Sequence, residues 1–398
     1  MGDALPAGAT KKVFFHVGAP KTGTTYLQQV LFQNREALAD DGVLYPYEFF
    51  DESFRSMQDF RGASWGQKGP GYYAGEWEKV ASRARDWTGS TVIISNELLG
   101  GSSPDRIAAG VASVQPADVH VIFSARDFAR QLVSDWQEHV KHKHRVTLEQ
   151  FVDDLVEKGL DAPPPFGELF WGMHDAAYVL QRWATVVPPE NIHLVTVPQP
   201  GAPRDTLWQR FCHVTGLDPD AYETETKRSN TSMGVAETEL IRRMNEDARS
   251  IRDDDYDRLV RIVLAERILG GQSPRLTLPP DRLEWVSQRS RQLIDELKGA
   301  GYQVEGDLEE LMPDPATHAT YVSPTALTEA DLAPAAIRAA QGLLRHSAML
   351  RSKVRELQEQ ADLRPVHKPT SRDRARDFYW RNRGRVGRVL RKMGLLRR

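Results

Sequence analysis

Residues 13–27 constrain the fold of this 398-residue chain more than any other segment. They read V-F-F-H-V-G-A-P-K-T-G-T-T-Y-L, which is an apolar run, two glycines with a lysine between them, and hydroxyl residues that open another apolar segment. Because Gly18 and Gly23 have no Cβ, the backbone can turn sharply there and aim N–H groups at an anion above a helix N-terminus. The segment predicts a buried strand, a phosphate-binding loop and a helix, with an anionic nucleotide as ligand. A turn that binds nothing is the alternative.

The lysine of this loop does not stand where a triphosphate-binding loop has it. In that motif the lysine directly follows the second glycine, whereas Lys21 precedes Gly23 by two positions. The variant P-K-T-G-T-T resembles the 5′-phosphosulfate loop of sulfotransferases that use 3′-phosphoadenosine 5′-phosphosulfate (PAPS). The resemblance implies that the loop holds this donor and that Lys21 also acts in catalysis by neutralising the leaving phosphate. The implied ligands are Pro20, Lys21, Thr22, Gly23, Thr24 and Thr25.

A second segment offers an anion site away from the first. Residues 119–124 predict a buried strand, and apolar residues at helical spacing follow from Phe128 onward. The 3′-phosphate motif of the same family has an arginine at the strand end, a serine eight residues later and an aromatic residue two beyond. Arg126, Ser134 and Trp136 stand at those offsets, so the resemblance implies that Arg126 and Ser134 bind the 3′-phosphate. An ordinary amphipathic helix is the alternative.

The family has a further basic residue that closes over the 3′-phosphate. The polar, basic segment 226–232 is the candidate, and it resembles the asparagine-containing version of bacterial members. The resemblance implies that Arg228 and Asn230 bind the donor. A solvated loop is the alternative.

One carboxylate is placed to act as a base. Residues 90–95 predict a central strand, and Glu97 follows it. Because ligands of open parallel sheets lie at the carboxyl ends of the strands, Glu97 should face the same crevice as Lys21 and Arg126. Sulfotransferases that act on sugars have a glutamate after such a strand, so the resemblance implies that Glu97 accepts the proton of an acceptor hydroxyl. A helix-capping carboxylate is the alternative.

These segments predict an α/β fold with three α/β/α layers, a central parallel sheet, a P-loop-like phosphate-binding loop and a C-terminal helical appendage. Residues 191–197 predict one more strand of the sheet. The predicted division is a PAPS-binding sulfotransferase domain over 1–232, a helical appendage over 233–312, a linker and helix over 313–363, and a basic tail over 364–398.

The predicted activity is transfer of a sulfuryl group from PAPS to a hydroxyl, on a carbohydrate or glycolipid rather than a small phenol. The aromatic, glycine-rich segment 60–77 suits a sugar ring, although its rings can equally pack the loop down. No metal is expected, because His139, His142 and His144 are spaced unfavourably for three ligands. A P-loop kinase that uses ATP is the alternative enzyme, and a non-catalytic nucleotide-binding protein is the third possibility.

Composition points to the compartment and the partners. The single cysteine, Cys212, excludes an internal disulfide, and no leader or spanning segment is evident, so a cytoplasmic location is expected. Residues 364–398 carry 13 Lys and Arg against 2 Asp, whereas the remaining residues carry a net charge of −14. This basic amphipathic tail suits an anionic membrane surface, which predicts peripheral association at the inner face of the membrane. A disordered basic tail is the alternative, and no nucleic-acid partner is expected.

Overall fold

The structure is a computed structural model that describes residues 10–63, 68–69, 71–226 and 232–362. Arg228, Asn230 and the basic tail lie outside the described residues. Residues up to Ala340 form one compact unit, and a second unit begins at Gln341.

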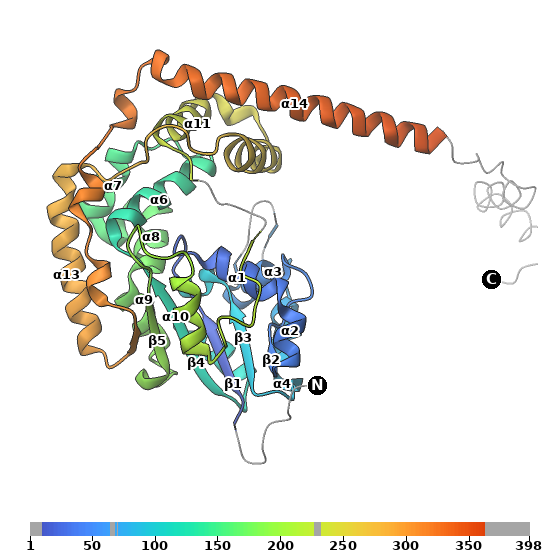
Figure 1. Ribbon diagram of the computed structural model, residues 1–398, viewed down its shortest axis with the longest axis vertical. Coiled ribbons are helices and arrows are strands. Elements are labelled where there is room, and N and C mark those ends of the chain that lie inside the picture. Colours follow the sequence, from blue (N-terminus) through green and yellow to red (C-terminus); the bar gives the residue numbers. More distant parts are fainter. Residues whose placement is uncertain (1–9, 64–67, 70, 227–231, 363–398) are drawn as a thin grey trace, which may run out of the picture. The chain divides into compact units, whose positions relative to one another are not determined.

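The described residues of the first unit are built on a six-stranded sheet in which every pairing is parallel (Figure 1). The strand order is β2-β3-β1-β4-β5-β6, so β1 lies between β3 and β4. In this register Phe14 pairs with Ile93 on one side and His120 on the other. The strands are β1 (Lys12–His16), β2 (Val43–Leu44), β3 (Thr91–Ser95), β4 (Asp118–Ala125), β5 (Ile192–Thr196) and β6 (Gln303–Glu305).

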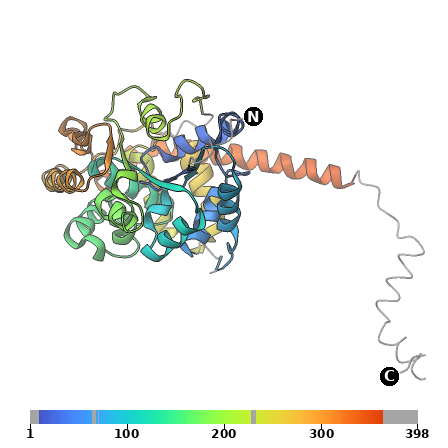
Figure 2. The ribbon, with the colours of Figure 1, turned by 90° about the horizontal axis from the view of Figure 1, so that it is seen from below.

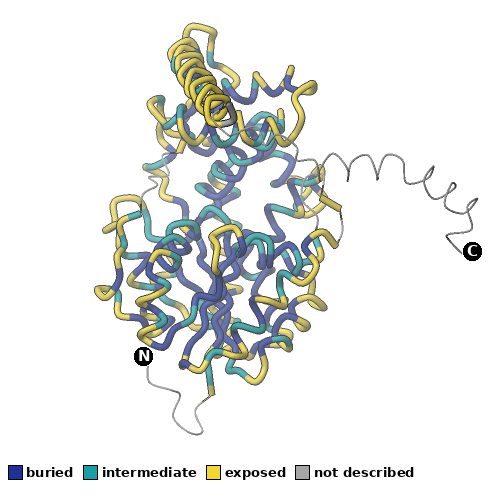
Figure 3. The backbone as a smooth tube through the Cα atoms, turned by 90° about the vertical axis from the view of Figure 1, so that its right-hand side faces the viewer, coloured by how far each residue is buried: buried dark blue, intermediate teal, exposed yellow. Residues whose placement is uncertain are grey.

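Helices cover both faces of this sheet (Figures 1 and 2). On one face the ring of Phe15 lies 5.5 Å from Trp183 and 6.5 Å from Phe60. On the other face the ring of His16 lies 5.4 Å from Phe211. Both sides of the central strands are buried, as Figure 3 shows, and most of their side chains are apolar. The predicted α/β fold class with three layers is confirmed.

Helices α1–α10 accompany the sheet, and further helices lie after residue 232. Those of the sheet region are α1 (Thr24–Gln33), α2 (Arg35–Asp40), α3 (Glu52–Arg61), α4 (Glu76–Asp86), α5 (Pro104–Ser113), α6 (Phe128–Lys141), α7 (Leu148–Lys158), α8 (Phe166–His174), α9 (Ala176–Trp183) and α10 (Thr206–Thr215). The later ones are α11 (Val235–Asp247), α12 (Asp253–Tyr256), a π-helix (Asp257–Ile268), α13 (Leu283–Gly299) and α14 (Glu329–Asp362). Among the described helices, none has the length and apolar composition needed to cross a membrane.

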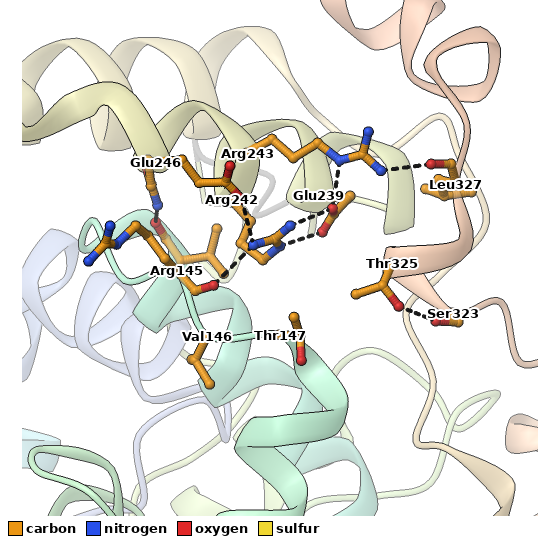
Figure 4. Close-up of polar contacts among 12 residues, drawn as sticks. Arg145, Val146, Thr147, Glu239, Arg242, Arg243, Glu246, Ser323, Thr325 and Leu327 are labelled. Atoms are coloured by element: carbon orange, nitrogen blue, oxygen red, sulfur yellow. Dashed lines mark hydrogen bonds and ion pairs between the residues drawn. The ribbon is translucent and has the colours of Figure 1, made fainter.

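A buried ion-pair cluster fastens α11 to the body (Figure 4). The fully buried Glu239 accepts hydrogen bonds from the guanidinium groups of Arg242 and Arg243. Arg242 also donates to the backbone carbonyl of Arg145 at 3.0 Å, and Arg243 donates to that of Leu327 at 2.7 Å. The segment after residue 232 is therefore tied to the loop that precedes α7. The predicted domain boundary at 232 stays a prediction, and β6 joins the sheet from beyond it.

Candidate active site

The predicted phosphate loop connects β1 to α1. Its first residues continue the pairing of β1 with β4, since the backbone N–H of Ala19 donates to the carbonyl of Ser124 at 2.8 Å. Gly23 has a φ of 88° and precedes α1, and a Cβ at this position would lie 2.5 Å from Leu207 Cδ2. The positive φ and this close approach both favour glycine there. The loop therefore ends at the N-terminus of a ten-residue helix, where the first N–H groups have no partner within the helix.

Lys21 has a left-handed backbone, with a φ of 64°. Residues other than glycine adopt this conformation rarely and at a cost, and such residues gather at binding and catalytic sites. Thr22 and Thr24 are buried, and the Thr22 hydroxyl donates to the carbonyl of Ala19 at 2.6 Å. The Pro20 carbonyl accepts from the Gln131 side chain on α6 at 2.6 Å. The loop is thus held in shape by its own hydroxyl and by α6.

The ammonium group of Lys21 forms an ion pair with Glu138 on α6. Glu138 also lies 3.1 Å from Lys141 Nζ and 3.4 Å from His142 Nε2. Burial opposes ionisation of Glu138, but the charge of Lys21, helped by His142 and Lys141, holds the pKa of this carboxyl well below its usual range. Glu138 is therefore an ionised carboxylate in direct contact with Lys21, the predicted catalytic lysine. The sequence analysis missed it, although Glu138 comes one helical turn after Ser134.

The predicted 3′-phosphate residues lie together at the start of α6. Asp127 caps this helix by accepting from the backbone N–H of Arg130 at 2.9 Å, which fixes Arg126 just before it. Arg126 Nη2 donates to Ser134 Oγ at 2.9 Å and to the Arg130 carbonyl at 2.9 Å. Burial lowers the pKa of Arg126 to about 10, so the guanidinium remains charged at neutral pH.

Two guanidinium nitrogens at this place are buried without a partner. Among the described residues, neither Arg126 Nε nor Arg130 Nη2 has a hydrogen-bond acceptor. A buried donor without an acceptor is costly and uncommon. An anion bound beside Arg126 would supply the acceptor that Arg126 Nε lacks.

A buried polar network supports the loop from α6 and α8. Gln131 donates to the Pro20 carbonyl and also contacts His174 Nδ1. His174 Nε2 lies 3.4 Å from one oxygen of Asp135, and His139 Nε2 lies 3.3 Å from the other. Burial alone would raise the pKa of Asp135, but the neighbouring imidazoles of His139 and His174 lower it below its usual range. His139 thus belongs to this network. Within the described ranges, no three metal-binding side chains gather to hold an ion.

Glu97 lies beside the loop, as its position after β3 predicts. It opens a short 3-10 helix, η1 (Glu97–Gly101), which Asn96 caps by accepting from the Leu98 N–H at 3.0 Å. Gln28 on α1 donates to Glu97 Oε2 at 2.7 Å. The backbone carbonyl of Glu97 lies 3.5 Å from the point where a Cβ on Gly18 would be. Because β3, β1 and β4 are adjacent parallel strands, Glu97, the loop and Arg126 follow the same edge of the sheet.

Some aromatic side chains of the predicted aromatic segment 60–77 are packed, and others are exposed. Trp77 is packed, with its ring 4.7 Å from Phe60 and its indole N–H donating to Ser113 Oγ at 3.0 Å. Tyr73 is buried, whereas Tyr72 is 63% exposed. Of the described rings in this loop, Tyr72 is the most exposed, and Lys68 Nζ lies 4.5 Å from the centre of its ring.

Comparison with known proteins gives little. No family model matches the chain, and no curated protein matches it. Among solved structures, a sulfotransferase from Alicyclobacillus acidocaldarius aligns with a TM-score of 0.38 and 17% identity, over 54% of this chain and 85% of that one. So distant a likeness decides neither the family nor the activity.

Proposed function

We propose that the chain is a PAPS-dependent sulfotransferase that sulfates a hydroxyl of a carbohydrate or glycolipid. The observation that supports this proposal is the presence of two separate groups of cationic and N–H donors, which follow β1 and β4. One is the loop with Lys21 at the N-terminus of α1, and the other is the pair Arg126–Ser134 with its unpartnered guanidinium nitrogen. A nucleotide with phosphates at both its 5′ and 3′ positions would occupy both sites.

The residues suggest an in-line transfer. The acceptor oxygen bonds to sulfur while the bond between sulfur and the bridging oxygen of the 5′-phosphate breaks. The electron pair of that bond stays on the bridging oxygen, where Lys21 and the loop N–H groups stabilise the charge. Glu97 takes the hydroxyl proton. Adenosine 3′,5′-bisphosphate and a sulfate ester are the products.

Calorimetry with adenosine 3′,5′-bisphosphate tests the donor site, with AMP and Mg-ATP as competing ligands. We expect tight binding of the bisphosphate, weak binding of AMP, and loss of affinity in Arg126→Ala. Arg291→Ala is the matched control, because Arg291 lies on α13 and pairs with Glu309. A preference for Mg-ATP would make the chain a kinase, and binding without any turnover would make it a non-catalytic nucleotide-binding protein.

Glu97→Gln tests the base. The amide keeps a hydrogen-bonding oxygen but cannot accept a proton at neutral pH. We expect unchanged bisphosphate affinity and a loss of turnover of at least about a hundredfold. A near-normal rate would remove Glu97 from this role.

We also propose that the chain acts in the cytoplasm and that residues 364–398 contact an anionic membrane surface. The support is the charge of this segment in the sequence. Sedimentation with anionic liposomes tests it, because a chain that ends at residue 363 should lose most of the binding. Equal binding of the two chains would exclude the tail as the membrane contact.

A further inference from the structure

The side-chain amide of Gln131 on α6 connects the phosphate loop to a buried histidine. Gln131 Nε2 donates to the Pro20 carbonyl at 2.6 Å and also contacts Nδ1 of His174, the last residue of α8. Gln131 and His174 are both buried. Among the described residues, Gln131 Oε1 has no hydrogen-bond donor. The orientation of this amide is therefore set by what its nitrogen binds.

The direction of each hydrogen bond in this chain follows from its acceptors. A carbonyl oxygen can only accept, so the amide nitrogen of Gln131, and not its oxygen, must face Pro20. The two hydrogens of that nitrogen then go to the Pro20 carbonyl and to His174 Nδ1. Because Nδ1 accepts, the neutral imidazole carries its proton on Nε2, which lies 3.4 Å from Asp135 Oδ1. Burial opposes ionisation of Asp135, but its two neighbouring imidazoles lower its pKa, so it accepts as a carboxylate.

This chain of hydrogen bonds fixes the peptide between Pro20 and Lys21. The C=O and N–H groups of a trans peptide point in opposite directions, so holding the Pro20 carbonyl toward α6 turns the Lys21 N–H away from that helix. The same peptide leads into the left-handed backbone of Lys21, whose φ is 64°. For a residue with a Cβ, this conformation is disfavoured by a factor of about 5–30. A turn of the peptide would relieve it, and the hydrogen bond from Gln131 opposes that turn.

We propose that Gln131 and His174 are positioning residues, which hold the Pro20–Lys21 peptide in the orientation that the donor requires. Asp135 takes part by keeping the proton of His174 on Nε2, so that Nδ1 stays an acceptor for Gln131. This role rests on the proposed function, because the ligand of the loop is the 5′-phosphate of the donor named there. Without these hydrogen bonds, only the fraction of molecules with the correct loop binds, and the apparent affinity falls by that fraction.

Calorimetry with adenosine 3′,5′-bisphosphate tests the role of Gln131. Gln131→Met keeps the length of the side chain but cannot donate, and we expect about tenfold weaker binding. Gln137→Met is the matched control, because Gln137 is also buried on α6 and its amide nitrogen also donates twice, to the Met233 carbonyl at 2.7 Å and to Thr238 Oγ1 at 3.1 Å. It should bind the bisphosphate like the wild type. Equal affinities of the wild type and Gln131→Met would overturn the proposal.

A pair of variants at His174 tests the acceptor. In His174→Asn, the amide Oδ1 replaces Nδ1, since both atoms are bonded to Cγ, and it can accept from Gln131. His174→Leu introduces a side chain of nearly the same size that has no acceptor, and it should bind the bisphosphate about tenfold more weakly than His174→Asn. Combining His174→Leu with Gln131→Met should cause no further loss, because His174 acts through Gln131. Equal affinity of the two His174 variants, or additive losses in the double variant, would refute the role of His174.

Hydrogen exchange in the unliganded chain measures the loop itself, without the donor. The amides of residues 18–24 should exchange faster in Gln131→Met than in the wild type and in Gln137→Met. If the wild type binds no bisphosphate, the proposed function fails, and this comparison alone decides whether Gln131 holds the loop. Equal exchange of the loop in all three proteins would show that it does not. Circular dichroism checks that each variant is folded.

Discussion

In the proposed donor complex, Glu138 competes with the 5′-phosphate for the ammonium group of Lys21. The two side chains are 32% and 27% exposed, so the pair is half-buried. Exposed ion pairs contribute about 0.2–1 kcal/mol, and this pair should lie near the upper end, at about 1 kcal/mol. Donor binding has to overcome this amount. Glu138→Gln removes the competing charge and should tighten binding of adenosine 3′,5′-bisphosphate about fivefold.

Calorimetry on four proteins isolates this effect: wild type, Glu138→Gln, Lys21→Met and the double variant. The gain in affinity should vanish when Lys21 is already absent, because Glu138 acts through that lysine. Adenosine 3′-monophosphate is the control ligand, since it has no 5′-phosphate, and its affinity should be the same for wild type and Glu138→Gln.

The opposite result would refute the reasoning. If Glu138→Gln weakens bisphosphate binding as much as Lys21→Met does, then Glu138 holds Lys21 in its working position and does not compete with the donor. If the wild type binds no bisphosphate at all, the proposed function fails. The ion pair between Lys21 and Glu138 is then still present in the structure, but it has no effect on donor binding.

Three further predictions concern the loop, the buried cluster and the sheet. Gly23→Ala should lower the melting temperature and abolish bisphosphate binding, because its Cβ would meet Leu207; Gly216→Ala, with a φ of 75° and open space around it, should lose only the backbone term of about 1–2 kcal/mol. Glu239→Ala should lower the free energy of unfolding in urea by about 1–3 kcal/mol, since Arg242 and Arg243 lose their buried acceptor while Arg242 keeps its ion pair with Glu246; an unchanged free energy of unfolding would contradict this. Burial lowers the pKa of His16 to about 4, so protons bind preferentially to the unfolded chain as the pH falls below about 6.5. The stability due to neutral His16 is complete above that pH and should fall by about 2 kcal/mol at about pH 5. Urea titrations at the two pH values measure this loss, and an equal loss in His16→Gln would assign it to other groups.

The strands that the sequence predicts are those with an apolar signal of their own. Residues 90–95, 119–124 and 191–197 are apolar runs, and they correspond to β3, β4 and β5. The edge strands β2 and β6 were not predicted, because they contain two and three residues. So short a segment has no periodicity, and its pairing depends on the neighbouring strand rather than on its own composition.

The placement of the candidate residues was predictable where strand ends determine it. Lys21, Glu97 and Arg126 follow three adjacent parallel strands, so their position at one edge of the sheet follows from the order of the strands; their role in a site stays a prediction. Their partners were not predictable, because Glu138 is 117 residues from Lys21 and Gln28 is 69 residues from Glu97. Which carboxylate pairs with a lysine depends on how α6 lies over the loop, and this is a property of tertiary packing.

The late position of β6 in the chain has a consequence for folding during synthesis. The sheet begins with its central strand and adds β5 by residue 196, but the strand that pairs with β5 ends at residue 305. For about a hundred residues of synthesis, β5 therefore presents an edge of unpaired N–H and C=O groups. Such an edge is a template for pairing with other chains. The long segment between β5 and β6 therefore delays the pairing of β5, and the nascent chain exposes this edge to aggregation until β6 is synthesised.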